Sequence, residues 1–135
     1  MTNIFIDTSA FIALYLSDDD FHQEAVRWLK EMEGKACFWT TNYILDETYT
    51  FVRSVKGKDA SVAFAEYLSS NSEIVKVKRV SLEEEKEAFV LFKKLDLKGL
   101  SFTDCTSFAV MKRLGLKQAF SFDKHFMQAG FELVP

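Results

Sequence analysis

The chain has 135 residues and a formal net charge of -3, from 17 Lys and Arg against 20 Asp and Glu, a length that fits one domain over residues 1–135. Hydrophobic residues make up 48% and aromatic residues 15% of the chain, which is enough to fill one core without disulfides or structural metals and excludes intrinsic disorder. No apolar run approaches the roughly 18 residues that cross a bilayer, and no basic, apolar leader opens the sequence, so we expect a cytoplasmic protein with no membrane partner.

The two cysteines, Cys37 and Cys105, stand far apart in the sequence and match no metal-ligand spacing. We therefore expect two reduced thiols. The slight acidic excess argues against nucleic-acid binding through bulk positive charge. A nucleic-acid role would need local basic patches or bound cations instead.

Short apolar and aromatic runs predict strands, and apolar residues three or four positions apart predict helices. In chain order the predicted elements are strand 3–7, helix 9–16, helix 21–32, strand 36–41, helix 42–56, helix 60–70, strand 74–80, helix 82–95, a helix from about 102 to near 115, strand 119–122 and a short edge strand 131–134. Strands that alternate with helices in this way predict an α/β fold, a three-layer α/β/α domain with a central, mostly parallel sheet.

Polar residues at the element boundaries predict where several helices begin. Asp20 is expected to cap the helix that starts near residue 21. Ser81 followed three residues later by Glu84 is a capping box. Ser101 or Thr103 is expected to cap the helix that ends near residue 115.

Four acidic residues fall where a parallel sheet would gather them. Asp7 and Asp123 each follow an apolar run that reads as a strand, Asp104 lies at the start of a helix, and Glu47 lies in the first turns of the helix after the second strand. In such sheets the ligand site lies beyond the carboxyl ends of the strands. Carboxylates that meet there repel one another unless a cation neutralises them, and oxygen ligands favour Mg2+ or Mn2+. Asp104 and Glu47 also fit a simpler role as favourable charges near helix N-termini.

Four segments together resemble the PIN-domain family across essentially the whole chain: IFIDTSAFI (4–12), TNYILDET (41–48), SFTDC (101–105) and AFSFDKHF (119–126). In size and layout the chain is most similar to the small VapC-type toxins, which are metal-dependent endoribonucleases controlled by an antitoxin. The resemblance implies an RNA substrate, an antitoxin partner, a homodimer and a Mg2+ or Mn2+ cofactor.

The resemblance also implies which residues form the site. The catalytic and metal-binding quartet is Asp7, Glu47, Asp104 and Asp123, with Thr8 and Ser9 supporting Asp7 and Ser121 supporting Asp123. Asp46 is a neighbouring alternative to Glu47, but the two side chains point about 100° apart on a helix, and we expect Glu47 to act. One or two ions would bind the scissile phosphate and activate a water for in-line attack.

Two other functions stay open. One is a housekeeping PIN nuclease in RNA processing or decay, and the other is a non-catalytic RNA- or protein-binding module with the same fold. A phosphatase of another doubly wound family would be expected to open with Asp-x-Asp, whereas Thr8 and Ser9 follow Asp7. The only histidines, His22 and His125, are expected to be surface helix residues, with His125 able to contact substrate.

Overall fold

A computed structural model describes all residues, 1–135. Its centre is a five-stranded sheet in the order β3-β2-β1-β4-β5, and every pair of neighbouring strands is parallel. The strands are β1 (Thr2–Ile6), β2 (Ala36–Thr41), β3 (Val75–Lys78), β4 (Gln118–Phe120) and β5 (Glu132–Val134). The predicted α/β fold with a parallel sheet is confirmed.

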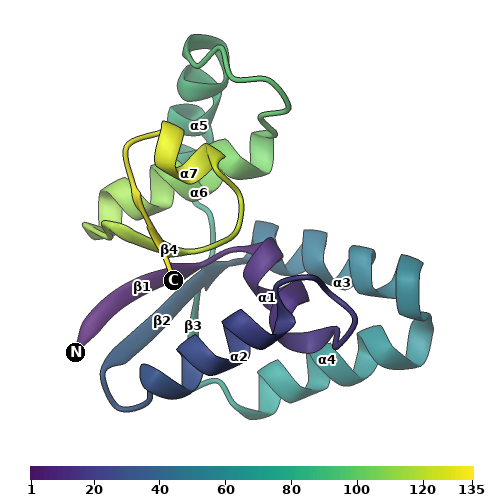
Figure 1. The fold of residues 1–135 in the computed structure, drawn as a ribbon. Coiled ribbons are helices and arrows are strands. Elements are labelled where there is room, and N and C mark those ends of the chain that lie inside the picture. Colours follow the sequence, from purple (N-terminus) through teal and green to yellow (C-terminus); the bar gives the residue numbers. More distant parts are fainter.

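Helices cover both faces of this sheet (Figure 1). One side carries α1 (Thr8–Tyr15), α2 (His22–Glu31), α3 (Asn42–Lys56) and α4 (Lys58–Ser70), and the other carries α5 (Leu82–Lys94), α6 (Phe102–Leu114) and α7 (His125–Gln128). None of the helices combines the length and apolar composition that a membrane-spanning segment needs.

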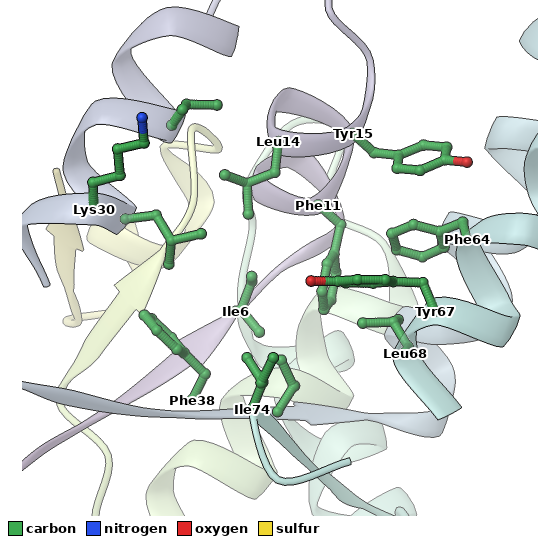
Figure 2. Close-up of a pocket in the computed structure, with 13 residues that line it drawn as sticks. Ile6, Phe11, Leu14, Tyr15, Lys30, Phe38, Phe64, Tyr67, Leu68 and Ile74 are labelled. Atoms are coloured by element: carbon green, nitrogen blue, oxygen red, sulfur yellow. The ribbon is translucent and has the colours of Figure 1, made fainter. Parts of the chain in front are cut away.

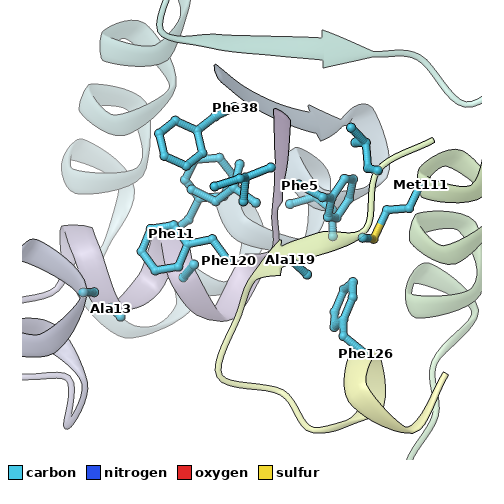
Figure 3. Close-up of a cluster of buried hydrophobic side chains, with 14 of the residues drawn as sticks. Phe5, Phe11, Ala13, Phe38, Met111, Ala119, Phe120 and Phe126 are labelled. Carbon is cyan, nitrogen blue, oxygen red and sulfur yellow. The ribbon is translucent and has the colours of Figure 1, made fainter. Parts of the chain in front are cut away.

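Aromatic side chains fill the core on both faces of the sheet (Figure 3). Successive residues of a strand point to opposite faces, and Phe5 of β1 packs against Phe126 of α7 with ring centroids 6.1 Å apart. Phe120 of β4 packs instead against Trp28 of α2, at 4.5 Å. Phe126 also meets Phe108 of α6 edge to face, at 5.2 Å. The core therefore fixes α7, and the residues beside it, onto the sheet.

A buried carboxylate joins β3 to α5. Glu84 is fully buried and forms the expected capping box with Ser81. Lys78 of β3 donates to the same carboxylate at 2.8 Å. Burial alone would raise the pKa of Glu84, but the hydrogen bonds from Lys78 and Ser81 outweigh burial and lower it. The predicted cap is confirmed.

Some predicted boundaries are wrong. Asp20 does not cap α2, because Phe21 occupies the N-cap position and the turn before it is closed by Asp19, whose carboxylate accepts a hydrogen bond from the Phe21 amide at 3.0 Å. Strand β4 ends at Phe120 instead of 122, since the Ser121 side chain turns towards the end of β1. The cap of α6 is Ser101 and not Thr103.

Candidate active site

The strand order places two acids on either side of a reversal in the sheet. The chain runs outward from β1 through β2 to β3, and the next crossover returns it to the other side of β1, where it forms β4. A crevice forms at such a switch point beyond the carboxyl ends of the strands, and ligands bind there in doubly wound sheets. Asp7 directly follows β1, and Asp123 lies three residues after β4. The prediction that both acids lie on this rim agrees with the topology.

Asp7 is buried at this rim, only 4% exposed, and is the N-cap of α1. Its Oδ2 atom accepts hydrogen bonds from the hydroxyls of Ser9 and Ser121, each at 3.0 Å. The Ser9 hydroxyl in turn accepts from the Phe122 amide, and the Ser121 hydroxyl accepts from the Asp123 amide. Two serines therefore tie the end of β1 to the segment that carries Asp123.

Thr8 connects the same rim to α3. Its hydroxyl accepts a hydrogen bond from Thr48 at 3.3 Å, and Thr48 also donates to the Ile44 carbonyl one turn earlier. All three side chains are buried. This contact holds the first turns of α3, where Glu47 lies, against the start of α1.

Asp104 is buried near the start of α6 and forms a capping box with Ser101. Its Oδ2 accepts from the Ser101 amide at 3.1 Å, while the Ser101 hydroxyl accepts from the Asp104 amide at 3.0 Å. The simpler role considered for Asp104, a favourable charge at a helix start, is therefore real. It fixes the carboxylate in place and does not prevent a second role.

His125 lies between Asp104 and Asp123, and the expectation of a surface position is wrong. The side chain is only 12% exposed, and its Nδ1 atom lies 3.0 Å from Asp123 Oδ1 and 3.5 Å from Asp104 Oδ2. These three residues form a group of ligand atoms that all lie within 4.8 Å of one another. The sequence offered one signal for this, the position of His125 two residues after Asp123. The loop and helix that complete the contact come from about twenty residues earlier, where no local pattern reveals them.

Glu47 is not part of that compact group. It is exposed on α3, as is its neighbour Asp46, and neither side chain makes a hydrogen bond or ion pair. Glu47 is adjacent to Thr48, which touches Thr8 beside Asp7. The structure thus brings Asp104 and Asp123 together and leaves Glu47 with an exposed carboxylate on α3.

Burial and the negative charge of a neighbouring carboxylate raise the pKa of two acids at this rim, Asp7 and Asp104. Burial raises the pKa of Asp7 to about 7, and the negative charge of Asp104 adds to this effect. Burial also raises the pKa of Asp104, with a further contribution from Asp123, although hydrogen bonds from Ser101 oppose it. The pKa of His125 is raised as well, first by its hydrogen bond to the Lys98 carbonyl and then by Asp123 and Asp104.

This donor set suits a divalent cation. Buried carboxylates that repel each other disfavour the folded protein unless a positive charge compensates them. Carboxylate oxygens from Asp104 and Asp123, with the imidazole nitrogen of His125, are ligands that divalent metals take in proteins. The acidic cluster is therefore a possible metal site, and the same chemistry leaves the identity of the ion open.

A second feature is an apolar groove between α1, α2 and α4. It has a volume of about 340 Å³, and 12 of the 13 residues that line it are hydrophobic. Figure 2 shows Phe64, Tyr67 and Leu68 of α4 facing Phe11 and Tyr15 of α1. Tyr67 is 58% exposed, and Ile74, just before β3, is 47% exposed. An open apolar surface of this kind is typical of a protein interface.

Comparisons with known proteins agree with this geometry. The PIN domain family matches residues 4–132. The "23S rRNA-specific endonuclease VapC20" of Mycobacterium tuberculosis is 36% identical over 129 residues, which cover 95% of each chain. A "VapC ribonuclease" of Archaeoglobus fulgidus is 32% identical over 124 residues, covering 90% of this chain and 77% of that protein.

Solved structures of VapC-type toxins share this fold. The crystal structure of M. tuberculosis VapC20, described as a sarcin-ricin loop cleaving toxin, superposes with a TM-score of 0.86 at 35% identity and covers 95% of both chains. VapBC2 from Rickettsia felis, bound to a promoter DNA fragment, shares the fold with a TM-score of 0.73 at 12% identity, over 98% of both chains. With residues 4–132 matched to the family and both sequence and fold aligned to VapC20 over 95% of its length, the chain belongs to the PIN-domain family as a VapC-type toxin endoribonuclease.

Proposed function

We propose that this toxin cleaves RNA with the help of one or two divalent cations held by Asp7, Asp104 and Asp123, with Glu47 acting beside them. The observation that carries the proposal is the burial of Asp7 and Asp104 at the switch point of the sheet, where burial raises the pKa of both carboxyls and the charge of Asp104 adds to the rise at Asp7. A fold that needed only stability would not keep such a pair. A bound cation would compensate the negative charge of these buried carboxylates.

Each residue has a distinct task in this proposal. Ser9 and Ser121 hold Oδ2 of Asp7, so the orientation of that carboxylate is set before substrate arrives. Ser101 does the same for Asp104. Glu47, which is exposed and makes no contacts, completes the ligand set or orients the attacking water. A bound Mg2+ or Mn2+ would polarise the scissile phosphate and lower the pKa of that water.

The substrate we propose is a structured ribosomal RNA, and the sarcin-ricin loop of 23S rRNA is the first to test. VapC20 of M. tuberculosis is a sarcin-ricin loop cleaving toxin, and this chain aligns with 95% of it at 36% identity. The test is cleavage of a sarcin-ricin loop oligonucleotide and of a scrambled hairpin by the purified protein with Mg2+, Mn2+ or EDTA. Metal-dependent cutting of the loop alone supports this substrate, and equal cutting of both contradicts it.

The alternatives give different results. A housekeeping nuclease would not halt growth when it is expressed, whereas a toxin would. A binding module would retain RNA without cutting it under any metal condition. Expression of the protein in an inducible strain, alongside the cleavage assay, separates the three.

We also propose that the groove between α1, α2 and α4 receives an apolar segment of an antitoxin. Structures of VapBC2 from Rickettsia felis, VapBC from Salmonella typhimurium and FitAB contain this fold. The groove exposes Tyr67 and Ile74, which are apolar enough to favour a partner. Ile74→Glu should abolish co-purification with the protein encoded by the adjacent gene, while Lys58→Glu on the exposed start of α4 should not. Loss of binding in both variants would contradict the groove assignment.

A homodimer is a further proposal. Leu82, Phe89 and Phe92 of α5 are each more than two-fifths exposed, and Leu82 and Phe89, seven residues apart, lie on one face of that helix. We expect a second copy to cover this face. Sedimentation equilibrium should give twice the chain mass for the wild type and a monomer for Phe89→Glu, and a monomeric wild type would contradict the proposal.

A further inference from the structure

His125 offers a feature that the oxygen-only ligand set does not include. It is the first residue of α7, and its ring lies between two carboxylates and a backbone carbonyl. Nδ1 faces Asp123 and Asp104, at 3.0 and 3.5 Å, while Nε2 lies 2.8 Å from the carbonyl oxygen of Lys98. The ring also packs over Gly99, where an added Cβ would lie 3.7 Å from Cε1. Both ring nitrogens are therefore held in fixed directions.

The carbonyl partner determines which nitrogen carries a hydrogen. A carbonyl oxygen only accepts hydrogen bonds, so Nε2 must donate. In the neutral imidazole the other nitrogen then has a lone pair, and that lone pair points at two carboxylates. Such a contact is repulsive unless a proton on Nδ1 or a metal ion lies between the nitrogen and the carboxylates. Metal-ligating histidines typically donate one ring N–H to a backbone carbonyl or carboxylate and bind the metal through the other nitrogen. Nε2 of His125 makes such a bond to the Lys98 carbonyl, and Nδ1 faces the acids.

We propose that Nδ1 of His125 is a ligand of the divalent cation, next to Asp104 and Asp123. This inference rests on the metal dependence proposed above and adds a nitrogen ligand to it. Neighbouring ligands of an octahedral ion with bonds of about 2.1 Å lie about 3 Å apart. The distances from Nδ1 to the two carboxylates, 3.0 and 3.5 Å, agree with that spacing before any rearrangement.

A nitrogen ligand changes which metals the site prefers. Imidazole favours transition metals, whereas Mg2+ prefers oxygen ligands and bound waters. The site is thus expected to select Mn2+ or a later first-row ion over Mg2+. A site made of carboxylate oxygens alone would give no basis for that choice.

A structural role must be separated from this one, because the same ring joins α7 to the loop around Lys98. The chain has only one other histidine, His22, whose Nδ1 lies 2.7 Å from the Ala13 carbonyl. His22 makes a comparable backbone contact far from the acids in sequence and on another element. It is a matched control for any effect of losing a histidine.

The test is electron spin echo spectroscopy of Mn2+ added to the purified full-length protein, with no RNA present. We expect a directly bound 14N signal in the wild type, which persists in His22→Gln and disappears in His125→Gln. We also expect His125→Gln to weaken Mn2+ binding by roughly tenfold or more and to affect Mg2+ binding much less. Circular dichroism of the variants checks that they fold.

Each other outcome overturns the proposal in a recognisable way. Mn2+ bound without nitrogen coupling, or coupling that survives His125→Gln, removes His125 from the ligand set and leaves the carboxylate site standing. Absence of any Mn2+ binding overturns the proposed metal dependence as well. If His125→Gln does not fold, the spectra of wild-type protein with 15N-labelled histidine and of labelled His22→Gln decide the question, because only two histidines exist.

Discussion

Hydroxyl groups, more than charges, set the orientation of the acids at the active site. The hydroxyl of Ser121 donates to Asp7 and accepts from the Asp123 amide, so one side chain positions two members of the proposed quartet. The hydroxyl of Ser9 makes the equivalent connection from α1. Groups that orient metal ligands in this way typically affect metal affinity or activity by 10- to 100-fold when they are removed.

Ser121→Ala is therefore expected to lower RNA cleavage by roughly 10- to 100-fold, because Asp7 loses one of its two serine hydrogen bonds. Ser54→Ala, which removes an exposed hydroxyl of α3 that bonds only to the Phe51 carbonyl, should leave cleavage unchanged. Initial rates at saturating metal give the comparison. Equal rates for Ser121→Ala and the wild type would refute the positioning role.

Glu47 and Asp46 are a second residue-scale test, since both are exposed and only one is assigned a role. Glu47→Gln should lower cleavage by roughly 100-fold or more, as is usual when a ligand or a water-orienting group is lost, while Asp46→Asn should change it little. The same assay with defined RNA measures both. The reverse pattern would transfer the role to Asp46.

At the scale of elements, the chemistry of helix starts was predictable and the course of the loops was not. Ser81 with Glu84 and Ser101 with Asp104 both have capping-box spacing in the sequence and both form the box. Asp20 fails as a cap because the turn before α2 uses Asp19. The His125 contact could not be predicted, since it depends on how the loop around Lys98 folds back onto α7.

Glu84→Gln tests the buried ion pair that joins α5 to β3. Gln still accepts from Ser81 but loses its charge towards Lys78, so the free energy of unfolding at pH 7 should fall by about 1 to 3 kcal/mol. The pKa of Glu84 is lowered by folding. Its contribution is therefore complete above its ordinary value of 4.5 and disappears as pH falls below it.

Urea unfolding of wild type and Glu84→Gln at pH 7 and near pH 3 measures this difference. Glu83→Gln is the control, because Glu83 is exposed and its ion pair with Lys86 is long, at 4.0 Å, and also exposed. Its unfolding should match the wild type at both pH values. A Glu84 effect that does not shrink at low pH would show that packing, and not charge, is responsible.

At the scale of the whole molecule, the fold separates two tasks. The switch point between β1 and β4 gathers the acids at one edge of the sheet, while the apolar groove lies between helices on one face. The sequence predicted the sheet, its parallel strands and the acids that follow β1 and β4, because strand periodicity and strand ends are local. It predicted that Glu47 joins the other acids, whereas the compact group consists of Asp104, Asp123 and His125, because the position of His125 depends on how distant segments fold onto one another.

We propose that the buried acids serve metal-dependent RNA cleavage and not stability. Asp7→Asn removes a buried negative charge whose pKa is already raised to about 7, so in EDTA its free energy of unfolding should equal or exceed that of the wild type. Its cleavage of RNA in Mg2+ or Mn2+ should nevertheless be lost.

The most direct measurement pairs these two readouts: cleavage of a sarcin-ricin loop oligonucleotide and urea unfolding, for wild type and Asp7→Asn, with and without EDTA. We expect metal-dependent cutting by the wild type alone, and a free energy of unfolding for Asp7→Asn in EDTA that is at least as high as that of the wild type. A variant that cuts as fast as the wild type, or a wild type that cuts equally well in EDTA, would contradict it.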